Sequence, residues 1–254
     1  MKLTVIPLIS SKKDGKFRFY EELKKIFHNN KVKIENGDVI VISSKFISMS
    51  QGRVLNIDNS KVCEKAKQIS KKFNSNEKFM EIVFRESDNI LGGISGFVMS
   101  STDGILAPNA GIDKSNSKGT EIILYPIEPY KFAEELKRKI FLEFNLHVGV
   151  IIVDSRLMPA RIGTTGVAIA CSGLEPTKDL RGKNDLDGNP LKVTFQATAD
   201  NLASIANYKM GEGDDLKPIT IIRNSECELT DRKIRSEEMI IPYKQCVYIR
   251  SFSS

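Results

Sequence analysis

The sequence has no tryptophan and only two histidines, His28 and His147, which narrows the chemistry that it can support. Neither histidine has a nearby serine or cysteine that would indicate a catalytic triad, so both are assigned to structural or solvated positions. The four cysteines lie far apart, and none belongs to a Cys-x-x-Cys pair. A zinc site is therefore not expected. We expect the four thiols to be reduced, as is usual in a cytoplasmic protein.

Long apolar runs are also missing, so no transmembrane helix is predicted. The first residues, Met1–Pro7, are interrupted too early for a signal peptide and are typical of a first strand. Basic patches interleaved with aromatic residues are absent, although the net charge is +6. The lysines are dispersed among acids, which argues against nucleic-acid binding but suits anionic substrates such as nucleotides.

Apolar runs and amphipathic stripes alternate along the chain and predict a mixed α/β protein, α+β in detail. The predicted strands are Leu3–Leu8, Val39–Ile42, Phe97–Met99, Ile105–Ala107, Val148–Val153, Val167–Cys171 and Ile219–Ile222. The predicted helices are Phe17–Phe27, a stripe from Val62 to Phe73, Glu77–Glu86, Tyr130–Leu146 and Ala197–Met210. Their irregular spacing argues against a doubly wound sheet.

The length of 254 residues suits one large domain or two small ones. We take residues 1–254 as a single unit that can contain two subdomains. The candidate boundaries are the glycine cluster near Gly92 and the polar stretch from Glu175 to Pro190.

The segment Asn109–Asn116 follows neither a helical nor a strand period. Gly111 permits a sharp bend, Asp113 offers a hard oxygen ligand, and Ser115 and Asn116 offer hydrogen-bonding groups. Such groups suit a divalent cation and a phosphate. A plain surface turn is the alternative, because the same residue types dominate turns.

Asp154 and Ser155 directly follow the apolar run Val148–Val153. A carboxylate at the exit of a buried strand is held rigidly beside an open loop, which suits a metal ligand. Arg156 and Arg161 come next and are candidate stabilisers of phosphate or carboxylate charge. A capping aspartate or a surface ion pair is the alternative.

A loop rich in glycine and acids, Met210–Asp215, ends the predicted helix Ala197–Met210. Glycine lets backbone N–H groups approach phosphate, and acids hold magnesium. The alternative is a glycine-terminated helix with a solvated acidic loop. The sequence has no Walker-type loop and no Gly-x-Gly-x-x-Gly after a strand, so a nucleotide would be held in another way.

In this order and spacing, the three segments resemble the coenzyme F420-0:L-glutamate ligase (gamma-glutamyl ligase) family. The resemblance extends from Pro7 to about Arg223. It is carried by Gly37–Lys45, Gly52–Arg53, Asn109–Asn116, Val148–Asp154, Val167–Ile169, Gly173–Pro176, Asp179, Arg181–Gly182, Asp185, Gly188 and Ala199–Gly213.

The resemblance implies a GTP- and divalent-metal-dependent ligase that joins L-glutamate to an acceptor carboxylate, with coenzyme F420-0 as the expected acceptor. The bond would form through an acyl phosphate, so no protein nucleophile is needed, which agrees with the missing triad. The resemblance also implies the gamma-glutamyl ligase-like α+β fold and an intertwined homodimer.

Carried over by position, the resemblance implies Mg²⁺ or Mn²⁺ at a set of four residues: Asp113, Asp154, Ser155 and Glu212. It implies a nucleotide at a second set of residues: Pro7, Leu8, Ile9, Ser44, Lys45, Asn116, Gly211 and Gly213.

Two stretches depart from the family pattern. Met49 stands where the family often has a lysine, and Arg156–Gly163 replaces an aromatic-Gly-Arg step. The second stretch resembles a lineage of ligases proposed to glutamylate folate-like acceptors. The alternatives are therefore the same chemistry on a folate or pterin-like acceptor, and a non-catalytic nucleotide-binding relative.

Overall fold

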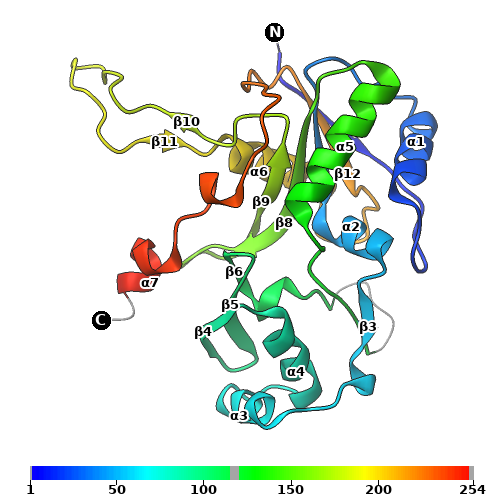
Figure 1. Cartoon of the computed structure of the whole chain (residues 1–254), viewed down its shortest axis with the longest axis vertical. Helices are drawn as coiled ribbons and strands as arrows, with labels where there is room; N and C mark the ends of the chain where they lie inside the picture. Colours follow the sequence, from blue (N-terminus) through cyan, green and yellow to red (C-terminus); the bar gives the residue numbers. More distant parts are fainter. Residues whose placement is uncertain (1, 115–119, 252–254) are drawn as a thin grey trace.

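A five-stranded sheet with the strand order β1-β12-β2-β8-β9 lies at the centre of the larger part of the chain (Figure 1). The structure is a computed structural model that describes residues 2–114 and 120–251. The sheet consists of β1 (Thr4–Leu8), β2 (Val39–Ser43), β8 (Gly149–Leu157), β9 (Thr164–Ser172) and β12 (Ile219–Arg223). Within this sheet β2 and β8 are parallel and the other neighbours are antiparallel, so β2 and β8 end at the same edge.

Helices cover both faces of this sheet because its central strands are apolar on both sides. One face carries α1 (Phe19–Asn29), α2 (Ser44–Gln51) and α5 (Pro129–Phe144), and the other carries α6 (Thr198–Met210). In β2, Ile40 and Ile42 pack toward the first group, whereas Val39 and Val41 pack toward α6. All four side chains are fully buried, which confirms the buried strand predicted there.

A small subdomain is inserted between α2 and α5. Its elements are β3 (Val54–Asn56), α3 (Glu64–Lys72), α4 (Glu77–Glu86), β4 (Asn89–Ile94), β5 (Phe97–Thr102), β6 (Ile105–Pro108) and β7 (Glu121–Ile123). The strands β4, β5 and β6 form a three-stranded sheet, and β3 pairs with β7. It has its own apolar core around Phe79, Met80 and Val98. Gly92 lies inside β4, at an irregularity in the register with β5.

The rest of the described chain, which we call the large subdomain, carries a projecting arm (Figure 1). The arm is built on β10 (Lys178–Asp179) and β11 (Phe195–Gln196), and it contains most of the polar stretch from Glu175 to Pro190. Beyond β12 the chain returns over the α6 side, where Ile234 is buried, and its last described element is α7 (Val247–Ser251).

The mixed α/β class is confirmed, and every predicted helix and strand is present. The predicted strand exit at Val153 is wrong, because pairing with β9 continues β8 to Leu157, so Asp154 lies inside the strand and not beside an open loop. The prediction missed α2 because Ser44–Gln51 interrupts its apolar stripe with serines. It also missed the strands β3, β4, β7, β10 and β11, and the break expected at Gly92 lies inside β4. Within residues 2–114 and 120–251, no helix combines the length and apolar character needed to cross a bilayer.

Gly166 in β9 allows α6 to pack closely on the sheet. A Cβ atom at this position would lie 2.5 Å from the Cβ of Asn207 and 2.6 Å from the carbonyl oxygen of Ala203. At the other end of the same contact, the Ala168 backbone N–H donates to Asp200 Oδ1 at 2.9 Å. The two contacts fix the height of α6 above β8 and β9.

Replacing Gly166 with alanine is therefore expected to lower the free energy of unfolding by about 1–3 kcal/mol, the usual cost of overpacking. Urea denaturation measures the change. Gly213→Ala is the matched control, because the nearest atom to its added Cβ is 3.9 Å away. Equal stabilities for the two variants would contradict the close contact.

Burial raises the pKa of Asp200 above its ordinary value, although the Ala168 N–H acts in the opposite direction. The folded protein then binds this proton more tightly than the unfolded chain, so the contribution of Asp200 to stability falls as pH rises above about 3.9. Asp200→Asn keeps the acceptor oxygen and should be more stable than the natural chain at pH 7. Thermal melting from pH 3 upward should show the difference vanish at the acid end.

Candidate functional site

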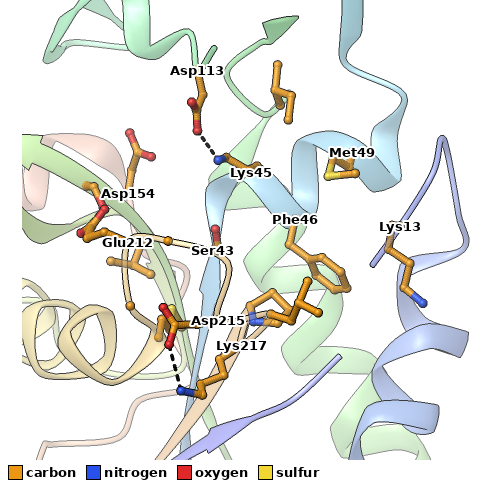
Figure 2. A pocket seen from close by; sticks show the side chains of 18 of the residues that line it. Lys13, Ser43, Lys45, Phe46, Met49, Asp113, Asp154, Glu212, Asp215 and Lys217 are labelled. Atoms are coloured by element: carbon orange, nitrogen blue, oxygen red, sulfur yellow. Dashed lines mark hydrogen bonds and ion pairs between the residues drawn. The ribbon is translucent and has the colours of Figure 1, made fainter. Parts of the chain in front are cut away.

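A cavity of about 1390 Å³ opens at the edge where β2 and β8 end, between the large and small subdomains. Its walls come from Phe97 and from stretches far apart in the sequence, within residues 10–16, 43–54, 108–113, 121–123, 153–164 and 207–218. All four predicted metal ligands therefore line one cavity: Asp113, Asp154, Ser155 and Glu212. Figure 2 shows the three acids among them. The carboxyl ends of parallel strands are where such sites are usually built.

Asp113 enters the cavity from the small subdomain. Its backbone exchanges two hydrogen bonds of 2.9 Å with Ile123, which anchors the strand end that carries it. Its carboxylate pairs with Lys45 Nζ of α2 at 2.5 Å, as Figure 2 shows. The pair thus links the two subdomains across the cavity.

The turn before Asp113 is tightly constrained. Asn109, Ala110 and Gly111 have consecutive positive φ angles of 50°, 58° and 67°. The Asn109 side chain accepts from the Val98 N–H at 3.0 Å, and a Cβ at Gly111 would lie 3.2 Å from Arg156 Nη1. The bend predicted at Gly111 is confirmed, and the lack of a side chain there also makes room for Arg156.

Asp154 lies where the parallel register brings α2 against β8. Because Ser43 is opposite Val153, Ser44 comes next to Asp154, and its hydroxyl donates to Asp154 Oδ1 at 2.7 Å. Arg156 Nη2 lies 2.9 Å from Asp154 Oδ2. This is an ion pair without hydrogen-bond alignment, since neither Nε nor Nη2 of Arg156 has a hydrogen-bond partner in the described chain. The guanidinium is only 6% exposed, so Asp154 compensates a buried charge.

Ser155 and Glu212 meet on the α6 side of the site. The Ser155 hydroxyl lies 2.8 and 2.9 Å from the two carboxylate oxygens of Glu212. Asn207, in the last turn of α6, donates to Glu212 Oε1 at 2.7 Å. Gly211, with a φ of 81°, turns the chain out of α6 and toward β8, which brings Glu212 to this position.

The predicted metal ligands thus lie in separate local pairings. Within the described ranges, no three His, Cys, Asp or Glu side chains form a metal-binding group. The donor set is nevertheless carboxylate and hydroxyl oxygen, which suits Mg²⁺ or Mn²⁺. These residues would hold such an ion from both walls of the cavity.

The nucleotide-binding predictions are placed as follows. Lys45, Gly211 and Gly213 line the cavity, and Ser44 lies behind it against Asp154. Asn116 is outside the described residues. The remaining three positions are not part of the wall: Pro7, Leu8 and Ile9. Leu8 is buried in the core, and the loop that follows β1 lines the cavity instead.

The sequence prediction missed the lysines of that loop and the lysine just before β12. Lys12, Lys13 and Lys16 line the cavity, as does Lys217, which pairs with Asp215 at 3.1 Å. The sequence signal that could have indicated them is a lysine-rich turn with a glycine, Gly15, soon after the first strand. Together these lysines add positive charge to a cavity that also contains Asp113, Asp154 and Glu212.

Of the residues that depart from the family pattern, some line the cavity and others do not. Met49 and Arg156 line the cavity. Arg161 is exposed in the loop after β8 and does not belong to the wall. The departures at Met49 and Arg156 therefore change the surface that a ligand would meet.

Comparisons with known proteins agree on one family. Residues 5–224 match the sequence model of F420-0:Gamma-glutamyl ligase. The chain is 36% identical over 195 residues to a coenzyme F420:L-glutamate ligase of Archaeoglobus fulgidus, covering 77% of this chain and 78% of the relative. It is 36% identical over 217 residues to the protein of that name from Methanocaldococcus jannaschii, covering 85% and 86%.

The Asp154–Arg156 pair predicts an asymmetric response to mutation. Asp154→Asn should lower the free energy of unfolding by about 3 kcal/mol, because it leaves the buried guanidinium uncompensated. The double variant Asp154→Asn/Arg156→Met should regain most of that loss. Urea denaturation of the two variants tests this, and a double variant no more stable than the single one would refute it.

Proposed function

The chain belongs to the F420-0:gamma-glutamyl ligase family and is thus an amide-forming ligase, and from this premise we propose that it joins L-glutamate to coenzyme F420-0 at the expense of GTP. The observation that carries the proposal is the convergence of Asp113, Asp154 and Glu212 on one cavity that also contains several lysines. A phosphoryl-transfer site needs both, acids for a divalent cation and cations for phosphate.

A divalent cation, Mg²⁺ or Mn²⁺, would be held by Asp113, Asp154, Ser155 and Glu212. When bound, it would offset the charge of the nucleotide phosphates. Lys45 pairs with Asp113, so the ammonium already lies beside the expected phosphate position. Gly211 and Gly213 line the cavity without Cβ atoms, so a phosphate could approach the backbone of this turn closely.

The chemistry proceeds in two steps that need no protein nucleophile. An acceptor carboxylate oxygen attacks the γ-phosphorus of GTP, the bond to the β,γ-bridging oxygen breaks, and GDP leaves. The amine of L-glutamate then attacks the acyl phosphate carbon, inorganic phosphate leaves, and the amine proton passes to solvent or phosphate. Arg156 and the lysines stabilise the negative charge of the reacting groups, while the cavity walls hold the two substrates in line.

The second candidate acceptor is a folate or other pterin carboxylate. The observation that favours it is that Met49 and Arg156 both line the cavity. A long apolar side chain and a guanidinium there would select for a different acceptor shape and charge.

The oligomeric state and the cellular location of the protein follow from the same proposal. We expect an intertwined homodimer in the cytoplasm. The arm supports a partner subunit, since its apolar side chains Leu186 and Val193 are 106% and 83% exposed.

The activity is tested by incubating the full chain with GTP or ATP, Mg²⁺ or Mn²⁺, L-glutamate and a panel of acceptors. Mass spectrometry should show one or more glutamyl additions to F420-0, with one nucleotide cleaved per addition. Addition to a pterin carboxylate alone would shift the function to the second acceptor. No glutamyl product and no nucleotide cleavage with any acceptor would refute the ligase.

Asp113→Asn should reduce kcat/KM by more than about 100-fold, because even partners behind the ligands of a metal cost 10–100-fold. The matched control is Asp58→Asn, which removes a charge of the same subdomain that pairs with Lys78 outside the cavity. Steady-state rates at several Mn²⁺ concentrations compare the two. Activity equal to the control would remove Asp113 from the metal set.

A further inference from the structure

Asn207 lies between two of the proposed metal ligands without being one of them. Its amide nitrogen is 2.7 Å from Glu212 Oε1, and its amide oxygen is 3.3 Å from Ser155 Oγ. It sits in the last turn of α6, against the glycine that admits the helix to β9. One side chain therefore contacts a residue of β8 and a residue of the loop after α6.

The chemistry of the neighbours determines which way the amide points. An ionised carboxylate only accepts hydrogen bonds, so the atom 2.7 Å from Glu212 must be the NH₂ group. The amide oxygen then faces Ser155. This orientation does not depend on telling oxygen from nitrogen by position alone.

The Ser155 hydroxyl has a single proton and several neighbouring acceptors. The two Glu212 oxygens are 2.8 and 2.9 Å away, and Asn207 Oδ1 is 3.3 Å away. While Ser155 donates to Glu212, its proton takes up one of the carboxylate lone pairs that a cation could use. Turning the proton to Asn207 Oδ1, the other acceptor in reach, leaves that carboxylate lone pair to a cation, and Ser155 Oγ keeps its own lone pairs as well.

We propose that Asn207 is a positioning residue for the cation site. Its amide oxygen accepts a hydrogen bond from the Ser155 hydroxyl while its NH₂ group donates one to Glu212. The inference rests on the proposed function, because it assigns a role in holding the divalent cation. An amide is the group that can do both, since an aspartate cannot donate and a leucine can do neither. Residues behind the ligands of a metal site commonly fix the ligands in this way.

The backbone around Asn207 supports this role. The Gly211 N–H donates to the Asn207 carbonyl at 3.0 Å, so the turn that carries Glu212 is fastened to the residue that holds its carboxylate. The approach allowed by Gly166 brings the Asn207 side chain to the level of Ser155. A substitution of Asn207 should therefore weaken cation binding more than it lowers the stability of the fold.

The test measures Mn²⁺ binding to the full-length chain by electron paramagnetic resonance, without nucleotide or acceptor. The variants are Asn207→Leu and Asn207→Ala, and the control is Ser204→Ala. Ser204 lies in the same helix and its hydroxyl contacts Thr165 Oγ1 at 2.8 Å, away from Glu212. Thermal melting of each protein reports on the fold.

Both Asn207 variants should bind Mn²⁺ about 10–100-fold more weakly than the natural chain, with Ser204→Ala within twofold of it. Unchanged Mn²⁺ affinity in the Asn207 variants would overturn the positioning role and leave the proposed function standing. Failure of both variants to fold, with a folded control, would also overturn it. Absence of Mn²⁺ binding by the natural chain would instead remove the metal from the proposed function.

Discussion

The parallel pairing of β2 with β8 is the constraint on which the site depends. Ser43, the last residue of β2, lies opposite Val153 of β8, so the next residues, Ser44 and Asp154, come within hydrogen-bond reach. A slip of one residue would turn Asp154 to the opposite face of the sheet. The alternation of apolar residues in β2 between α6 and the α1, α2 and α5 side makes such a slip costly. The core therefore sets the position of the acid.

Charge compensation is the second organising feature. Lys45 compensates the charge of Asp113, and Arg156 compensates that of Asp154. Glu212 is held by a hydrogen bond from the neutral Asn207 amide, so each candidate acid has a partner in the chain itself. A cation at these carboxylates competes with the ammonium and the guanidinium for the same oxygens. A phosphate brought in with the cation offers Lys45 and Arg156 a new anion. For the proposed reaction, metal and nucleotide would then bind more tightly together than apart.

The elements of the fold were largely predictable, and the links between them were not. The buried strands at 39–42 and 148–153 have apolar runs too continuous for any other assignment, and α5 has a clear stripe. The resemblance to a family selected the acids, because no periodicity connects Asp113, Asp154 and Glu212. The lysine loop and Asn207 were missed for a physical reason. Their roles depend on which segments lie across the cavity, and that is a property of the register and the helix packing, which no local pattern reports.

Small residues in α6 and β9 complete the argument about position. The loop that carries Glu212 can reach Ser155 because α6 lies close to the sheet, and it lies close because Gly166 has no Cβ atom to meet Asn207 and the Ala203 carbonyl. A larger residue at either place would lift the helix end, and Glu212 with it, away from β8. A shift of about 1 Å is enough to misalign a catalytic constellation. The glycine in β9 and the carboxylate beyond α6 thus belong to one requirement, although 46 positions separate them in the sequence.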